Sequence, residues 1–217
     1  MVINEEVALK TASYLLQIKA IKLNPSQPFT WASGWKSPIY CDNRKTLSYP
    51  KIRTYIRQQF SEAILDQYGK PDMVVGVATG GIANGALVAQ ELGVGFAYVR
   101  SASKDHGLEN LIEGVVEAGQ SVVVCEDLIS TGGSSLKAVD ALRKAGCNVM
   151  GMVAIFSYGF KVAEDAFKKS KCKLVTLSDY SSLLSQAVED GFVDKNELQL
   201  LARWREAPDK WGKGTDL

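Results

Sequence analysis

Five short apolar runs follow one another between residues 73 and 177, and helical patterns separate most of them. The runs span residues 73–78, 96–100, 121–126, 149–156 and 173–177. Apolar side chains recur with helical spacing over residues 81–92, 132–145 and 159–170. Continuous apolar strands that alternate with helices are typical of a parallel sheet covered on both faces. The pattern therefore predicts an α/β fold with a mostly parallel central sheet flanked by helices.

The N-terminal part of the chain shows a different pattern. Apolar positions between residues 4 and 20 recur with helical spacing, and Asn4 can cap that helix. Residues 29–44, rich in aromatic side chains and interrupted by breakers, predict two short strands joined by a turn, which we call the hood. A long helix is expected from residue 48 until Gly69.

We interpret residues 1–217 as one domain, in line with their number. The N-terminal helix and hood span about residues 1–45, the core sheet about 70–178, and the C-terminal helices with a loose tail 179–217.

The segment 101–111, SASKDHGLENL, shows neither helical nor strand periodicity. A long polar loop in a compact α/β domain is either disordered or a functional lid.

Composition and charge limit the classes of binding partner that can be expected. The formal net charge is only +1, which gives no electrostatic reason to expect nucleic acid or an anionic membrane. No apolar run approaches the length of a membrane span, and the acidic N-terminus has no apolar signal core. The four cysteines are far apart and form no C-x-x-C pair, so reduced thiols are expected rather than zinc ligands or disulfides. These features predict a soluble, cytoplasmic protein.

The stretch VVVCEDLISTGGSS, residues 122–135, places Glu126 and Asp127 at the end of an apolar run and a glycine-containing loop after them. Ligands of open parallel sheets bind beyond the carboxyl ends of the strands. A helix expected to begin near Gly133 would offer main-chain N–H groups to an anion. The carboxylates would repel that anion but accept hydrogen bonds from hydroxyls. The stretch predicts a sugar-phosphate site, with hydroxyl donors at Ser130, Thr131 and Ser134.

The glycine-containing stretches have three other interpretations. The stretch at 122–135 could be an ordinary strand–helix turn with a capping serine. A P-loop needs Gly-Lys followed by Ser or Thr, and the sequence has none. The segment GVATGGIANG, residues 76–85, lacks the G-x-G-x-x-G spacing of a dinucleotide site.

The stretch VVVCEDLISTGGS resembles the phosphoribosyl-diphosphate signature of the type I phosphoribosyltransferases. Three further stretches, FTWASGWKSPIY, GVATGGIANGALVA and YVRSASKDHGLENLIEG, are similar in order and spacing to orotate phosphoribosyltransferases. The resemblance covers most of residues 29–135. It implies the type I phosphoribosyltransferase fold and transfer of phosphoribosyl from phosphoribosyl diphosphate to orotate, giving orotidine 5′-monophosphate and diphosphate in pyrimidine biosynthesis.

The resemblance also implies site residues. Glu126–Ser134 would hold the ribose and its 5′-phosphate, and the turn at 78–81 would contact the diphosphate. Lys104 and Asp127 would be the catalytic residues, and Ser130 would also touch orotate. The phosphoribosyl-diphosphate site would comprise Thr79, Gly80, Arg100, Lys104, His106, Glu126, Asp127, Leu128, Ile129, Ser130, Thr131, Gly132, Gly133 and Ser134.

The segment 101–111 would cover the diphosphate and reach the neighbouring subunit's site, which implies a homodimer. Physical chemistry supports cations here, because the leaving diphosphate gains charge as the glycosidic bond breaks. Arg100 and Lys104 suit that need, whereas His106, the single histidine, could also be merely solvated. Mg²⁺ would be bound mainly through phosphoribosyl diphosphate, with few or no protein ligands.

The sequence departs from the family pattern where relatives often carry lysine or another cation, at Ala32, Gly80 and Ser101. Lys36 or Arg44 could compensate, or could be surface charges. The segment FSYGF, residues 156–160, lacks an arginine that some relatives place there. Two alternatives stay open: a transferase for another base, and a non-catalytic regulator that senses phosphoribosyl diphosphate.

Overall fold

The computed structural model describes residues 2–31, 34, 36–100 and 111–211. Its centre is a six-stranded sheet in the order β10-β9-β8-β5-β6-β7. These strands are β5 (Met73–Val77), β6 (Gly95–Val99), β7 (Ile112–Glu113), β8 (Ser121–Ile129), β9 (Asn148–Ser157) and β10 (Leu174–Asp179). Every pairing in it is parallel except that of β7 with β6. The predicted α/β fold is confirmed.

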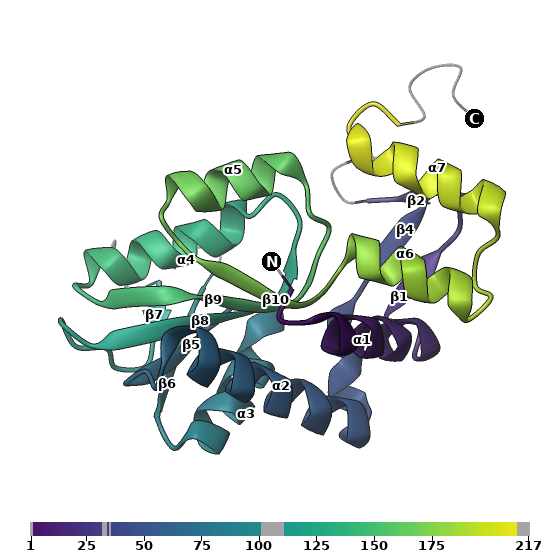
Figure 1. Cartoon of the computed structure of the whole chain (residues 1–217). Helices are drawn as coiled ribbons and strands as arrows, with labels where there is room; N and C mark the ends of the chain where they lie inside the picture. Colours follow the sequence, from purple (N-terminus) through teal and green to yellow (C-terminus); the bar gives the residue numbers. More distant parts are fainter. Residues whose placement is uncertain (1, 32–33, 35, 101–110, 212–217) are drawn as a thin grey trace.

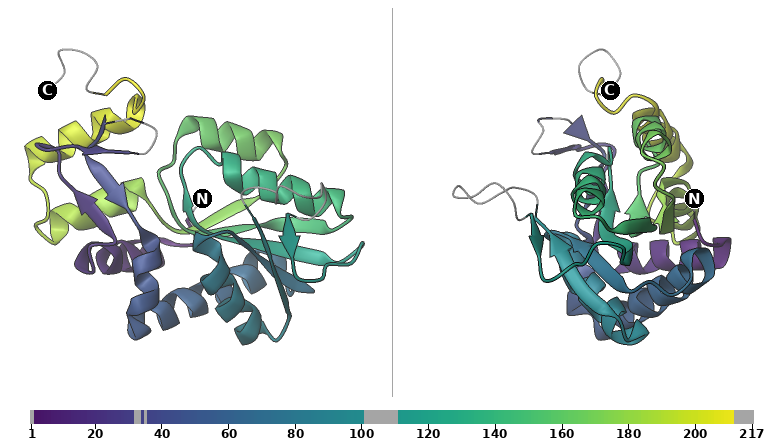
Figure 2. Two further views of the ribbon diagram at one scale, coloured as in Figure 1. Left: turned by 180° about the vertical axis from the view of Figure 1, so that it is seen from behind. Right: turned by 90° about the vertical axis from the view of Figure 1, so that its left-hand side faces the viewer.

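Helices cover both faces of this sheet (Figure 1). On one face lie α4 (Gly133–Lys144) and α5 (Lys161–Lys169), and on the other α2 (Pro50–Tyr68) and α3 (Gly80–Leu92). The left-hand view of Figure 2 shows the same layers from behind. Apolar side chains fill the space on each side, for example Leu142 and Phe167 on the α4–α5 side. Burial on both faces explains why these strands are continuous apolar runs.

The remaining elements gather where β10 runs into α6 (Figure 1). They are α1 (Glu5–Gln17), β1 (Ile21–Leu23), β2 (Phe29–Thr30), β3 (Lys36–Ser37), β4 (Ile39–Cys41), the 3-10 helix η1 (Asn43–Ser48), α6 (Tyr180–Glu189) and α7 (Lys195–Glu206). The pairs β1–β4 and β2–β3 are antiparallel. Rings of Trp31, Tyr158, Phe160 and Tyr180 surround the fully buried Trp204 of α7 and bind this part together.

Most element predictions are confirmed within a few residues, including the cap of α1, whose Val7 N–H donates to Asn4 Oδ1 at 2.8 Å. Two pairings were missed. The strand β7 is only two residues long, and β1 is equally short, so neither shows a readable periodicity. The two predicted hood strands are present as the antiparallel pair β2–β3, and β4, which follows them, pairs with β1.

Two predictions were wrong in part. The strand expected to end at Glu126 continues to Ile129, because β8 keeps its pairing with β9 through Leu128 and Ile129. The segment from 208 was expected to be a loose tail, but Trp211 is buried in the core that includes Trp204. The fold places no helix in the described ranges that is long and apolar enough to cross a membrane.

Candidate functional site

A cavity of about 360 Å³ lies at the carboxyl ends of β5 and β8. It is lined by Cys41, Asp42, Arg44, Ala78, Thr79, Gly80, Glu126, Asp127, Leu128 and Ser134. Three separate parts of the sequence therefore meet here: the segment after β4, the start of α3, and the acid-containing end of β8. The cavity brings the two acids next to residues 78–80 of the turn before α3.

Glu126 is turned into the protein. Glu126 is only 5% exposed, and its Oε2 accepts a hydrogen bond from Ser135 Oγ at 2.9 Å. Its other oxygen accepts from the main-chain N–H of Asp127 at 3.0 Å. Burial, followed by the neighbouring Asp127 carboxylate, raises the pKa of Glu126 far above its usual range. The folded protein therefore favours the protonated form of Glu126 to a higher pH than an exposed glutamate would allow.

Asp127 is the acid that faces the cavity and the start of α3. Its carboxylate lies directly against Gly80, where a β-carbon would overlap it. Its main-chain carbonyl accepts a hydrogen bond from Asn43 Nδ2 at 2.7 Å, so the segment after β4 fixes the position of the acid pair. Asn43 is fully buried and was missed in the sequence, because a single asparagine outside any motif gives no signal.

The loop between β8 and α4 presents main-chain N–H groups to the site. Gly132 has a left-handed backbone with φ of 80°, and a β-carbon there would come within 2.8 Å of the ring of Phe167. The first turn of α4 has no side-chain cap, and Thr131, Gly133 and Ser134 are exposed. Uncapped N–H groups and the helix dipole favour an anion at this position.

The structure distinguishes among the charged residues that the sequence suggested for this site. Arg44 lines it, with Nε donating to Asp42 at 2.7 Å, and that contact raises its pKa. Lys36 instead donates to Thr30 Oγ1 at 2.8 Å within the hood. Arg100, at the end of β6, pairs with Glu113 at 3.4 Å and does not line the cavity. Arg44 is therefore the better placed of the two cations considered as compensation.

Several predicted positions lie outside the described residues. They are Lys104 and His106 of the segment 101–111, and the family departures Ala32 and Ser101. The predicted Ser130 is described, but Ser134 and not Ser130 lines the cavity with the acids. Leu128 also lines it, whereas Ile129 is fully buried.

The arrangement combines a hydrogen-bond acceptor, Asp127, with two helix N-termini, those of α3 and α4. A carboxylate suits sugar hydroxyls and helix N-termini suit phosphate oxygens. In the described part of the chain, no three His, Cys, Asp or Glu side chains cluster as a metal site. The geometry fits a phosphorylated sugar that carries a second anionic group toward α3.

Comparisons with known proteins identify the family of this chain. A family model described as the phosphoribosyl transferase domain matches residues 46–185. The chain is 58% identical over 203 residues to the orotate phosphoribosyltransferase of Phocaeicola vulgatus, covering 94% of this chain and 96% of that protein. It is 56% identical to the Porphyromonas gingivalis enzyme of the same name, with 93% and 96% coverage.

Solved structures show the same fold. The orotate phosphoribosyltransferase of Aeropyrum pernix superposes with a TM-score of 0.73 at 26% identity, covering 84% of this chain and 99% of that one. The Leishmania donovani UMP synthase gives a TM-score of 0.76 at 24% identity, with 91% of this chain matched to 42% of that one.

Proposed function

The chain belongs to the phosphoribosyl transferase domain family and, within it, to the orotate phosphoribosyltransferases, and from this premise we propose how its residues divide the reaction. The reaction joins orotate to phosphoribosyl diphosphate and releases diphosphate, a step of pyrimidine biosynthesis. We propose that Asp127 accepts hydrogen bonds from the ribose hydroxyls. Glu126 would hold Asp127 in place by accepting a hydrogen bond from its main-chain N–H at 3.0 Å.

The two helix N-termini bind the anionic ends of the substrate. Main-chain N–H groups of residues 130–134 would hold the 5′-phosphate at the uncapped start of α4. Thr79 and Gly80, at the start of α3, would contact the diphosphate, and no side chain caps that helix either. The 360 Å³ cavity lies between these two ends and suits a ribose. Ser130 would touch orotate, as the resemblance implies.

Cations from the segment after β6 complete the site in our proposal. Lys104 and His106 would neutralise charge that develops on the leaving diphosphate, and Lys104 would be catalytic. Arg100 would also bind phosphoribosyl diphosphate, after release from its 3.4 Å contact with Glu113. The segment would act in the site of a second copy of the chain, which makes the enzyme a homodimer.

Mg²⁺ fits this donor set. The ion prefers one or two carboxylates together with substrate phosphates and keeps several waters, and Asp127 supplies a carboxylate beside the turn proposed for diphosphate. When bound, Mg²⁺ would neutralise diphosphate charge. A cytoplasmic location is supported by four free cysteines, three of them buried, as expected of a reducing compartment.

The observation that carries the proposal is one cavity lined by Asp127, Gly80 at the start of α3 and Ser134 at the start of α4. The test is an assay with phosphoribosyl diphosphate and Mg²⁺ against orotate, uracil, hypoxanthine and adenine. We expect orotate to be consumed far faster than the others. Preferred use of another base would indicate a different transferase, and no turnover with retained phosphoribosyl-diphosphate binding would indicate a regulator.

A further inference from the structure

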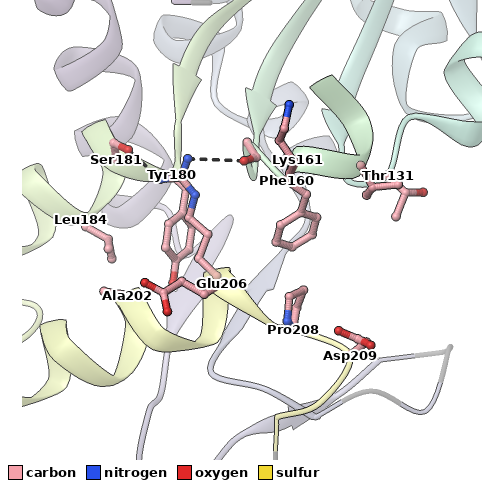
Figure 3. A pocket seen from close by; sticks show the side chains of 13 residues that line it. Thr131, Phe160, Lys161, Tyr180, Ser181, Leu184, Ala202, Glu206, Pro208 and Asp209 are labelled. Carbon is pink, nitrogen blue, oxygen red and sulfur yellow. Dashed lines mark hydrogen bonds between the residues drawn. The ribbon is translucent and has the colours of Figure 1, made fainter. Parts of the chain in front are cut away.

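A second cavity borders the loop between β8 and α4, which we call the phosphate loop because we propose that it holds the 5′-phosphate. Its volume is about 860 Å³, within the usual range of small-molecule sites. Thr131 of the loop borders it, whereas Ser134 of the same loop borders the cavity that holds the acids. The opposite walls come from the starts of α5 and α6 and the end of α7 (Figure 3). A ligand held by the loop can therefore extend into this space.

One cation is fixed on the wall of this cavity. Arg205 of α7 donates to Ser181 Oγ at 2.8 Å and to the carbonyl of Gly159 at 3.4 Å. Its guanidinium also lies over the ring of Tyr180, 5.8 Å from the centroid. These three contacts hold the side chain in one orientation.

The chain leaves space for the guanidinium at the end of β9. Gly159 has φ of 64°, and a β-carbon there would lie 2.9 Å from Arg205 Nη2. A guanidinium has five N–H donors, and the two contacts with Ser181 and Gly159 use only part of them. Among the described residues Arg205 has no ion pair, so donors stay available to a carboxylate.

Other charges around the cavity select the kind of anion. Lys161 is engaged with Asp165 at 2.6 Å, and its side chain is 78% exposed, so it contributes little. Glu206 and Asp209 also line the cavity and would repel a phosphate or a diphosphate. A ligand with a single carboxylate, directed at Arg205, meets less repulsion than a polyanion.

The apolar part of the wall suits a flat ring. Phe160 projects into the cavity between Thr131 and Tyr180 (Figure 3), and both aromatic residues are buried in the cluster around Trp204. Rigid rings and one fixed guanidinium are features that recognise a planar aromatic carboxylate.

We propose that Arg205 is a specificity-determining residue that binds the carboxylate of orotate in this second cavity. The inference rests on the proposed function, because it assigns the base of that same reaction to the space beside the phosphate loop. Phe160 borders the part of the cavity in which the pyrimidine ring would lie. Uracil, which lacks the carboxylate, gains nothing from Arg205.

The test compares Arg205→Gln with Arg203→Gln, a matched change at an exposed arginine on the same helix. We expect Arg205→Gln to raise the KM for orotate at least tenfold, while the KM for phosphoribosyl diphosphate changes less than twofold. Orotate binding by calorimetry should weaken by the same factor, and Arg203→Gln should match the wild type in both measurements.

Several results would overturn the proposal. They are an unchanged orotate KM, an equal rise in both KM values, or the same effect from Arg203→Gln. If Arg205→Gln does not fold, Arg205→Lys keeps the charge but loses the planar fork. It should still raise the orotate KM severalfold, and no rise would refute the role. Failure of the proposed function itself is distinct, because the wild type would then not consume orotate.

Discussion

The carboxylate of Asp127 occupies the space in which a β-carbon at position 80 would lie. Gly80 begins α3, so Asp127, the acid that we propose to be catalytic, is in direct contact with the start of a neighbouring helix. This contact accounts for the glycine at position 80, because any β-carbon there would overlap the Asp127 carboxylate. A side chain at position 80 would force Asp127 away from its present place.

The first prediction follows from this contact. We expect Gly80→Ala to displace the Asp127 carboxylate and to lower kcat/KM by about tenfold, roughly the effect of losing one charge-assisted hydrogen bond. The measurement is a double-mutant cycle with Asp127→Asn. If the added methyl group acts by displacing Asp127, then Gly80→Ala should lower kcat/KM only slightly further in a protein that already carries Asp127→Asn. Strictly additive losses would contradict that route.

The second prediction concerns Asp127 alone. Asp127→Asn keeps the shape but removes the charged acceptor for the ribose hydroxyls, a loss of roughly 1.5–3 kcal/mol. We expect kcat/KM to fall by more than about tenfold in steady-state assays. Asp140→Asn, at an exposed position on α4, is the control and should leave the kinetics unchanged. A normal Asp127→Asn enzyme would show that this carboxylate does not meet the ligand.

The third prediction is a pH dependence of stability. Burial raises the pKa of Glu126 to about 9, so the folded protein keeps a proton that the unfolded chain loses above its usual pKa near 4.5. The contribution of Glu126 to stability is complete below about pH 4.5 and is lost as the pH rises toward 9. One proton gives at most about 1.4 kcal/mol per pH unit.

Glu126→Gln isolates this contribution, because an amide keeps the shape and does not titrate. The free energy of unfolding, measured by urea titration between pH 5 and 9, should fall more steeply with pH in the wild type than in Glu126→Gln. Parallel curves for the two proteins would show that Glu126 ionises normally.

The sequence was sufficient to predict the sheet and the acid-bearing loop. Both depend on local patterns: apolar runs for buried strands, and two acids followed by glycines for the site. The strand nevertheless extends past Glu126, because its pairing with β9 is a contact between distant segments. The sequence pattern of residues 122–129 alone does not show how far the pairing with a neighbouring strand extends.

Residues that act through tertiary contacts could not be predicted. Asn43 fixes Asp127 across 84 positions of sequence, and Arg205 reaches Gly159 across 46. Neither belongs to a motif, and both are joined to the site only by the folded chain. The two-residue strand β7 was missed because strands this short carry no readable alternation.

The fourth prediction concerns the segment after α7, which the sequence suggested would be loose. Trp211 is only 8% exposed and packs in the same core as Trp204. Trp211→Ala should therefore lower the free energy of unfolding by about 3 kcal/mol. Phe192→Ala, at an aromatic residue that is 47% exposed, should change it by less than about 0.5 kcal/mol. Equal, small effects would mean that Trp211 contributes nothing to the core.

The last prediction tests whether two copies of the chain share each site. Lys104 lies outside the described residues, and we propose that it acts on the diphosphate in the partner's site. Lys104→Ala should lower kcat more than it weakens substrate binding, because charge on the diphosphate is greatest in the transition state. A Lys104→Ala enzyme with normal turnover would exclude the residue from the mechanism.

Mixing two inactive variants then distinguishes the subunits. If Lys104 crosses between copies, a mixed dimer of Lys104→Ala with Asp127→Asn holds one site with both changes and one site with neither. Activity should therefore recover on mixing, toward a quarter of the wild-type level if the subunits exchange at random, since half of the dimers are mixed and each has one intact site. If Lys104 acts in its own subunit, every site carries one change and mixing restores nothing. Subunit exchange, followed by mass spectrometry of the dimers, makes the absence of recovery decisive.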